Sequence, residues 1–155
     1  SLWLGRPVVG QRVTDILALV RALRNEAGWA GMRMWIAANG QLTAPALYAA
    51  SMETAISGLF LSSPLLSFRA VTESEEYRHP LSNFVPGLLK RVDLPRVVGS
   101  IAPRPVVLAG ILSGAGTPVA AEEAARAYGG ERHVRVVPKA EWSGRGILAQ
   151  LAGQP

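Results

Sequence analysis

Residues 32–50 read MRMWIAANGQLTAPALYAA, a short apolar run that leads through Asn39 and Gly40 into an alanine-rich segment. The apolar run, residues 32–38, is interrupted only by Arg33 and is typical of a strand covered by helices on both faces. Asparagine and glycine are the residue types that most readily adopt positive φ, which a sharp reversal from strand to helix requires. The stretch therefore predicts a buried strand, a tight turn and a helix that packs closely on a sheet.

The predicted turn lacks a reactive side chain. The same order of strand, turn and helix surrounds the nucleophile in the G-x-S-x-G elbow of many hydrolases. The corresponding residues here, 38–42, read ANGQL, so a glycine occupies the place of the nucleophile and neither flanking glycine is present. The turn contains no serine, cysteine or aspartate. We therefore expect the shape of the elbow without its chemistry.

Helices and strands alternate on both sides of this unit. Apart from residues 32–50, the expected strands are 56–62, 105–112 and 133–137, and the expected helices are 8–24, about 118–128 and about 146–152. Helices between buried apolar strands indicate an α/β fold with a parallel sheet of about four strands and helices on both faces. Residues 1–155 are expected to form a single domain, because a chain of this length buries one sizeable core.

The connection between the second and third predicted strands, residues 64–104, is unusually long. Its length of about 40 residues exceeds the need of a simple crossover. Asp93 is expected to cap a short helix within it. An insertion at the carboxyl end of a strand usually lies over the ligand crevice of an open α/β sheet, so a lid is one of two equally supported interpretations. The alternative is a packing segment that covers the edge of the sheet.

The composition argues against several classes of protein. The longest apolar region, residues 56–68, is interrupted by serines and a proline and is too short to span a bilayer, so no membrane association is expected. The net charge is +5, but arginines and glutamates are interleaved and aromatic residues make up only 6% of the chain, so no nucleic-acid binding is expected. Without cysteines, the chain has no thiolate chemistry and carries no signal of its cellular compartment.

No cofactor or metal site is expected either. The two histidines lie far apart in the sequence without H-x-x-x-H spacing, and no set of acidic residues accompanies them. A glycine-containing loop at residues 113–116 precedes a predicted helix but lacks the G-x-G-x-x-G pattern and the lysine of a P-loop. A plain turn is therefore the preferred interpretation of this loop.

Together these segments resemble the carboxyl half of an α/β-hydrolase, with the acetyl-xylan-esterase and dienelactone-hydrolase-like group as the nearest likeness. The most specific segments are LGRPVVGQRVTDIL at residues 4–17 and FVPGLLKRVDLPRVVGSIAPRPVVL at residues 84–108. The resemblance implies that the predicted strands are the fifth to eighth of an eight-stranded sheet. It also implies that the first four strands are missing from this chain.

The resemblance assigns the catalytic triad of the family to positions where this chain has other residues. The serine falls at Gly40, the acid in the loop around Ser113 and the histidine in the loop around Glu141. The oxyanion hole of the family also takes one N–H group from a loop after an early strand that this chain lacks. No catalytic residue is therefore assigned. By family position, Asn39, Gly40, Gln41, Ser113 and Glu141 are the candidate ligand-binding residues of the crevice.

Other residues in the chain offer a poor replacement for the triad. A relocated triad of Ser62 or Ser63 with His79 and Asp93 is conceivable, but isolated serines at strand ends usually bond the backbone. A histidine in a connecting segment is more often solvated or capping than catalytic. His133 opens the last predicted strand, so it is expected at the surface, at the amino end of the sheet.

Two functions are compatible with this sequence. The first is a degenerate, non-catalytic hydrolase-like domain with a structural or interaction role. The second is an ester hydrolase of acetyl-xylan-esterase type, acting on short-chain acyl or carbohydrate esters through non-standard residues or sequence outside this chain. Loss of all three triad residues favours the first function.

A partner is expected at the first strand. The chain starts with a serine and without the pattern of a signal peptide, which suggests that the natural amino terminus lies upstream. Without the preceding strands of the family, residues 32–39 would form an exposed apolar edge, and such edges pair with other chains. We therefore expect a missing amino-terminal half, or another protein chain, to cover residues 32–39.

Overall fold

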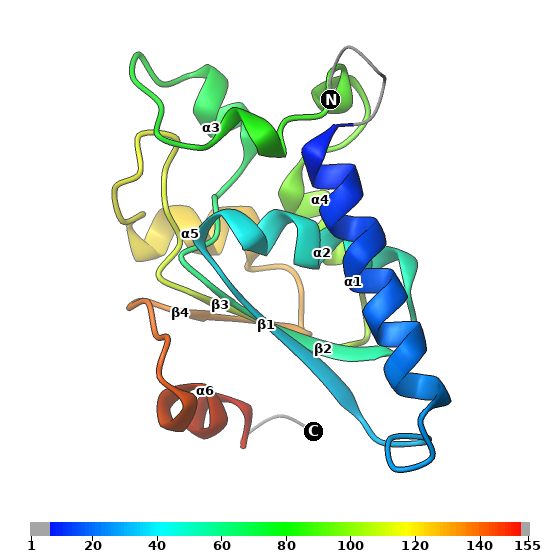
Figure 1. Cartoon of the computed structure of the whole chain (residues 1–155). Coiled ribbons are helices and arrows are strands. Elements are labelled where there is room, and N and C mark those ends of the chain that lie inside the picture. The colour runs from blue at the N-terminus through cyan, green and yellow to red at the C-terminus, as the bar shows by residue number, and fades with distance from the viewer. Residues whose placement is uncertain (1–6, 153–155) are drawn as a thin grey trace.

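The computed structural model describes residues 7–152 and consists of alternating helices and strands (Figure 1). The strands are β1 (Met34–Asn39), β2 (Ile56–Ser62), β3 (Val106–Ala109) and β4 (Val134–Val137). The α-helices are α1 (Val8–Asn25), α2 (Thr43–Met52), α3 (Phe68–Thr72), α4 (Leu94–Gly99), α5 (Ala121–Tyr128) and α6 (Gly144–Leu151). Short 3₁₀ turns are η2 (Gly40–Leu42), η3 (Leu81–Asn83) and η4 (Leu88–Lys90).

The sheet confirms the predicted α/β class. Its four strands are parallel and lie in the order β1-β2-β3-β4, so β1 and β4 are the edges of the described sheet. Strand β3 is shorter than expected because Gly110 takes a left-handed conformation, with φ of +62°, and ends the extended backbone. Leu112 then forms only isolated bridges, to Leu65 and Pro118.

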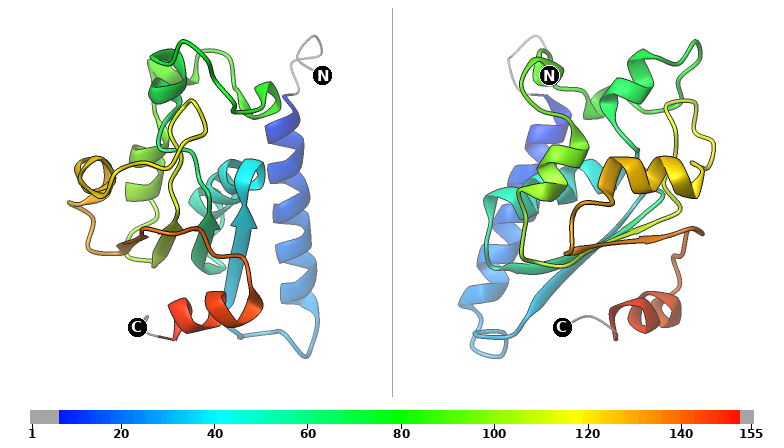
Figure 2. Two further views of the ribbon diagram at one scale, coloured as in Figure 1. Left: turned by 90° about the vertical axis from the view of Figure 1, so that its left-hand side faces the viewer. Right: turned by 180° about the vertical axis from the view of Figure 1, so that it is seen from behind.

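Helices cover the two faces of the sheet unequally. Figures 1 and 2 show α1, α2, α4 and α5 on one face and α6 on the other. The main apolar core lies under the first group and includes Ile56, Leu59 and Leu61 of β2, which are almost completely buried. A smaller cluster lies under α6, where Ile147 packs against the buried Phe60. Because side chains alternate along β2, this strand contributes apolar residues to the clusters on both faces of the sheet.

A tryptophan covers part of the α6 face near the β1 edge. A Cβ atom added at Gly58 of β2 would come within 2.7 Å of the Trp35 ring of β1. Glycine at this position therefore allows the indole ring to approach the backbone of the neighbouring strand. The packing explains why glycine, a residue that weakens strands, lies within β2.

Residues 64–104 contain two parts with different positions. The first part reaches over the carboxyl ends of the strands, where the Arg78 N–H donates to the carbonyl oxygen of Gly114 (3.0 Å). The second part carries α4, which packs beside α2 on the main face of the sheet. These contacts give the second part a packing role. The interpretation of the first part as a lid stays a prediction.

Asp93 ties the two parts of this connection together. Its carboxylate accepts hydrogen bonds from the N–H groups of Leu94 (2.7 Å), Phe68 (2.8 Å) and Arg69 (3.1 Å). It therefore serves the first turns of both α4 and α3. The expected cap at Asp93 is confirmed, and its second helix could not be read from the sequence.

Candidate crevice at the carboxyl ends of the strands

The turn between β1 and α2 has an open space at Gly40. Its φ is +55°, whereas Asn39 stays extended with φ of −126°, so only the glycine is left-handed. A Cβ atom added at Gly40 would meet no atom within 4 Å. The Thr43 hydroxyl donates to the Gly40 carbonyl oxygen (2.7 Å) and fixes the turn. A side chain at residue 40 would thus project into open space.

A crevice of about 340 Å³ lies beside this turn. The turn contributes Gly40 and Gln41, the loop after β3 contributes Ser113, and the connection between β2 and β3 contributes Arg78 and His79. Three of the five candidate ligand-binding residues therefore meet in one cavity. The connection folds back far enough to bring its histidine there, which the sequence left open.

The other two candidate residues do not line this crevice. Asn39 is exposed at the end of β1. Glu141 lies before α6, and its carboxylate accepts a hydrogen bond from the Ser143 N–H (2.7 Å). Hydrogen bonds from the backbone and the side chain of Ser143 lower the pKa of the Glu141 carboxyl. Glu141 thus stabilises the start of a helix.

The relocated triad is wrong. The Asp93 oxygens are engaged by three backbone N–H groups, and no hydrogen bond joins Asp93 to His79 in the part of the chain that the structure describes. Ser62 is buried, and its hydroxyl has no hydrogen-bond partner there. Ser63 does line the crevice with His79, in a left-handed conformation with φ of +52°. A serine and a histidine therefore share the crevice, and none of the described residues that line it is an acid.

Asn83 determines the hydrogen-bonding state of His79. The completely buried Asn83 amide accepts from Arg12 Nη1 through Oδ1 (3.2 Å) and donates through Nδ2 to the Gln41 carbonyl oxygen (2.6 Å). Arginine only donates and a carbonyl only accepts, so these two bonds assign the orientation of the amide. The Nδ2 group lies 3.2 Å from His79 Nε2 and must donate to it. Nε2 is therefore the unprotonated nitrogen.

The neutral imidazole of His79 consequently carries its proton on Nδ1. Burial lowers the pKa of His79, which favours this neutral form. The ring packs edge-on against Phe68 and Phe84, with centroid distances of 5.7 Å and 5.9 Å. Because Nε2 already accepts a hydrogen bond from Asn83, His79 can offer a ligand the N–H group of Nδ1 but cannot act as a general base.

Sequence reasoning overlooked Asn83 and Arg12 as parts of this site. Both lie in segments that had been recognised, Arg12 in the predicted first helix and Asn83 four residues after His79. Their meeting depends on contacts between α1 and η3, which are 71 positions apart at these two residues. A buried amide in a connecting segment is the only local signal, and burial is not visible in the sequence.

The expectation for His133 needs a correction. It precedes β4 at the amino end of the sheet, as expected, but its side chain is only 7% exposed. Nε2 lies 3.1 Å from the Val98 carbonyl oxygen, and Nδ1 lies 3.5 Å from a carboxylate oxygen of Glu131. The ring is therefore held between α4 and the segment before β4, and it is not a surface residue.

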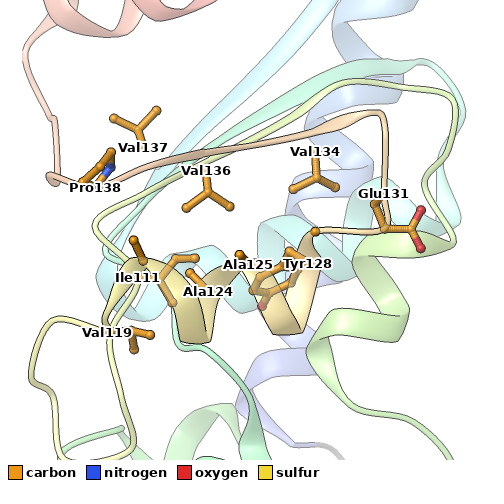
Figure 3. A pocket seen from close by; sticks show the side chains of 12 residues that line it. Ile111, Val119, Ala124, Ala125, Tyr128, Glu131, Val134, Val136, Val137 and Pro138 are labelled. Carbon is orange, nitrogen blue, oxygen red and sulfur yellow. The ribbon is translucent and has the colours of Figure 1, made fainter.

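A second cavity, of about 360 Å³, lies between α5 and β4 (Figure 3). Its walls are mainly aliphatic and include Ala124 and Ala125 of α5 and Val134 and Val136 of β4. Both of its larger polar side chains already have partners: the Tyr128 hydroxyl donates to the Leu66 carbonyl oxygen (2.7 Å), and a Glu131 carboxylate oxygen lies 3.5 Å from His133 Nδ1. Ligand sites usually combine apolar walls with a few convergent polar groups, so the crevice beside Gly40 is the better candidate.

Residues 7–152 contain neither a candidate membrane span nor a candidate metal site. No helix among them is long and apolar enough to cross a membrane. No group of three or more histidine, aspartate or glutamate side chains is placed to hold a metal ion within the same residues.

A solved structure shares this fold. It is the crystal structure of a protein from Bacteroides fragilis NCTC 9343 that is given as a candidate acetyl xylan esterase, with a TM-score of 0.62 and 17% sequence identity. The match covers 83% of this chain but only 36% of the other, so this chain spans about a third of that protein. The fold of this chain is therefore that of part of the Bacteroides fragilis structure. No protein-family model and no curated protein matches the sequence.

Proposed function

We propose that this chain is a degenerate α/β-hydrolase-like domain that binds or supports another molecule and does not hydrolyse esters. The observation that carries the proposal is Gly40, which stands at the left-handed turn between β1 and α2 without a side chain. The elbow of a hydrolase needs a nucleophilic side chain at this position. Glycine retains the backbone geometry and removes the attacking atom.

The remaining polar groups support a binding role. Ser113 shares a 2.8 Å hydrogen bond with Thr117 inside its own loop, where a hydrolase of this type would need a carboxylate. Glu141 is engaged at the start of α6, in the loop where a histidine would be needed. His79 offers a donor through Nδ1, because Nε2 is engaged by Asn83. A general base and its orienting acid are thus both missing from this arrangement.

An ester-hydrolysis assay tests this proposal. The purified chain, and the longer natural polypeptide if one exists, are expected to hydrolyse p-nitrophenyl acetate no faster than buffer does. They are also expected to remain unlabelled by a serine-directed fluorophosphonate, because the crevice has no activated hydroxyl. Turnover that disappears in Ser63→Ala and persists in Ser113→Ala would contradict the proposal.

That contrary outcome would support the second candidate, a short-chain acyl or carbohydrate esterase that uses non-standard residues or sequence outside this chain. One observation favours it. Ser63 shares the crevice with His79 and has the left-handed backbone that strained nucleophiles adopt, with φ of +52°. The lack of an acid among the described lining residues weighs against it, because none of them would orient His79 or stabilise its protonated form.

We also propose that a further polypeptide segment pairs with β1, either more of the same protein or another chain. In the described sheet, β1 pairs only with β2, and Met32 beside it is 57% exposed. Apolar edges of this kind promote association. Hydrogen exchange and sedimentation of this chain alone are expected to show concentration-dependent association, with protection of β1 amides that do not bond to β2. A dilute monomer in which those amides exchange freely would contradict the proposal.

A further inference from the structure

We infer that the crevice beside Gly40 binds a small molecule that has one carboxylate on a compact apolar body. The inference rests on the proposed binding role and adds the chemical class of the ligand. Three features carry it: the charge of the crevice, the protonation of its histidine and the character of its walls.

Arg78 gives the crevice a positive charge. It is the charged residue among the described residues that line the cavity, and no aspartate or glutamate lines it with Arg78. The guanidinium group has no ion-pair partner among residues 7–152. The side-chain stem lies close to the loop after β3, since a Cβ atom added at Gly116 would come within 3.2 Å of Arg78 Cβ. Glycine at residue 116 thus allows arginine to lie along the rim.

His79 adds a neutral donor to this charge. Nε2 accepts from Asn83, so Nδ1 carries the proton, and no hydrogen bond to Nδ1 occurs among the described residues. His79 lines the crevice and is half-buried. An oxygen of a ligand in the crevice can therefore accept this hydrogen without displacing any hydrogen bond within the protein.

One cation and one neutral donor match a monoanion that has two acceptor oxygens. A guanidinium group pairs with a carboxylate through parallel hydrogen bonds. A phosphate dianion would leave part of its charge uncompensated here, because no second cation lines the cavity among residues 7–152. Leu65, Pro80 and Leu112 supply apolar walls for the rest of the ligand.

The missing side chain at Gly40 leaves space for the body of this ligand. The volume beside the residue is open, with no protein atom within 4 Å of an added Cβ. No nucleophile projects from the turn toward a bound carbonyl carbon. A carboxylate has no leaving group, so the ligand dissociates unchanged.

Benzoate, methyl benzoate and inorganic phosphate are suitable probes, with binding followed by chemical shifts in ¹H–¹⁵N spectra of the chain. Benzoate is expected to bind with a dissociation constant on the order of 1 mM, as befits a ligand of few atoms. The shifts should centre on the amides of Gly40, Gln41 and His79. Methyl benzoate, which lacks the charge, and phosphate, which lacks the apolar body, are each expected to bind at least about 10-fold more weakly.

Arg78→Gln is the test variant, because the guanidinium group makes no described contact that folding requires. It is expected to weaken benzoate binding by about 10-fold or more, and Arg78→Lys should restore part of the loss. Arg145→Gln is the matched control, since it removes the same charge from exposed Arg145 of α6 and should leave the affinity unchanged. The inference is overturned if benzoate fails to bind, if both glutamine variants lose affinity equally, or if the ester or phosphate binds as well as benzoate.

These outcomes are separate from those of the hydrolysis assay. If benzoate does not bind and no ester is hydrolysed, the proposed ligand class is wrong, but the non-catalytic proposal is unaffected. Turnover that depends on Ser63 removes the non-catalytic proposal, whatever the affinity for benzoate.

Discussion

Arg104→Ala is expected to lower the free energy of unfolding by about 3 kcal/mol, since the change removes several charge-assisted hydrogen bonds at once. Arg104 Nη1 donates to the carbonyl oxygens of Ile56 (2.9 Å) and Glu53 (3.0 Å), and Nη2 donates to that of Ala50 (2.8 Å). These acceptors lie at the end of α2 and the start of β2. The alanine variant leaves them without the guanidinium group that joins the two elements.

Urea denaturation provides the measurement, with a fall in the midpoint at an unchanged slope as the expected result. Arg104→Lys should recover less than half of the loss, because an ammonium group lacks the planar fork that reaches three carbonyls. Arg96→Ala is the control at an exposed position of α4 and should change the stability by less than about 0.5 kcal/mol. Equal, small effects at both positions would show that the Arg104 bonds contribute little.

Asn83→Ala is expected to lower the free energy of unfolding by about 2–4 kcal/mol, since buried groups left without partners are costly. The change removes the acceptor of Arg12, the donor to the Gln41 carbonyl and the donor to His79 Nε2. Three segments are joined by this one amide: α1, the turn after β1 and the connection over the crevice. The loss should therefore exceed that of an ordinary surface hydrogen bond.

The ¹⁵N shifts of His79 separate this network from a general loss of stability. In the parent chain, Nδ1 is expected to show the shift of a protonated nitrogen and Nε2 that of an unprotonated one. Asn83→Asp should reverse the two, because a carboxylate in the amide position accepts from Nε2–H and cannot donate. Ser82→Ala, at the preceding residue of η3, should leave both shifts in place. A protonated Nε2 in the parent chain would refute the assignment.

The sequence predicted an element best where the pattern of its apolar residues matches the faces that the fold buries. The bounds of β2 agree with the prediction, because apolar side chains are needed on both faces of a covered strand and the run stands out. The predicted bounds of the first helix, 8–24, are also close to those of α1, Val8–Asn25, since its buried residues Val9, Val13 and Val20 follow the helical spacing. In both elements, local pattern and tertiary burial point to the same answer.

Element ends were less predictable where loops form their own contacts. The predicted helix at about 118–128 begins at Ala121, because Pro118 pairs with Leu112 in an isolated bridge. The last helix begins at Gly144, two residues early, where the Ser143 hydroxyl accepts from the Gly146 N–H (3.1 Å). In both helices the observed start differs from the predicted one because of a contact that the pattern of apolar residues does not reveal.

The crevice was predicted in part. The expected meeting of Gly40, Gln41 and Ser113 follows from the carboxyl ends of parallel strands, which lie at one edge of a sheet. Glu141 was placed by resemblance alone, and its loop instead turns toward α6. The histidine in the crevice comes from a connection whose path depends on the Asn83 amide, and such long-range hydrogen bonds leave no periodic trace in a sequence.

The open space at Gly40 makes the turn a place for a reporter group. The chain contains no cysteine, so Gly40→Cys would create a single thiol that one reagent modifies without background. Its Cβ would meet no neighbour within 4 Å, and the left-handed backbone, with φ of +55°, would be the main source of strain. A fluorophore attached there would sit at the mouth of the crevice and sense its solvent, its motion and its occupancy directly.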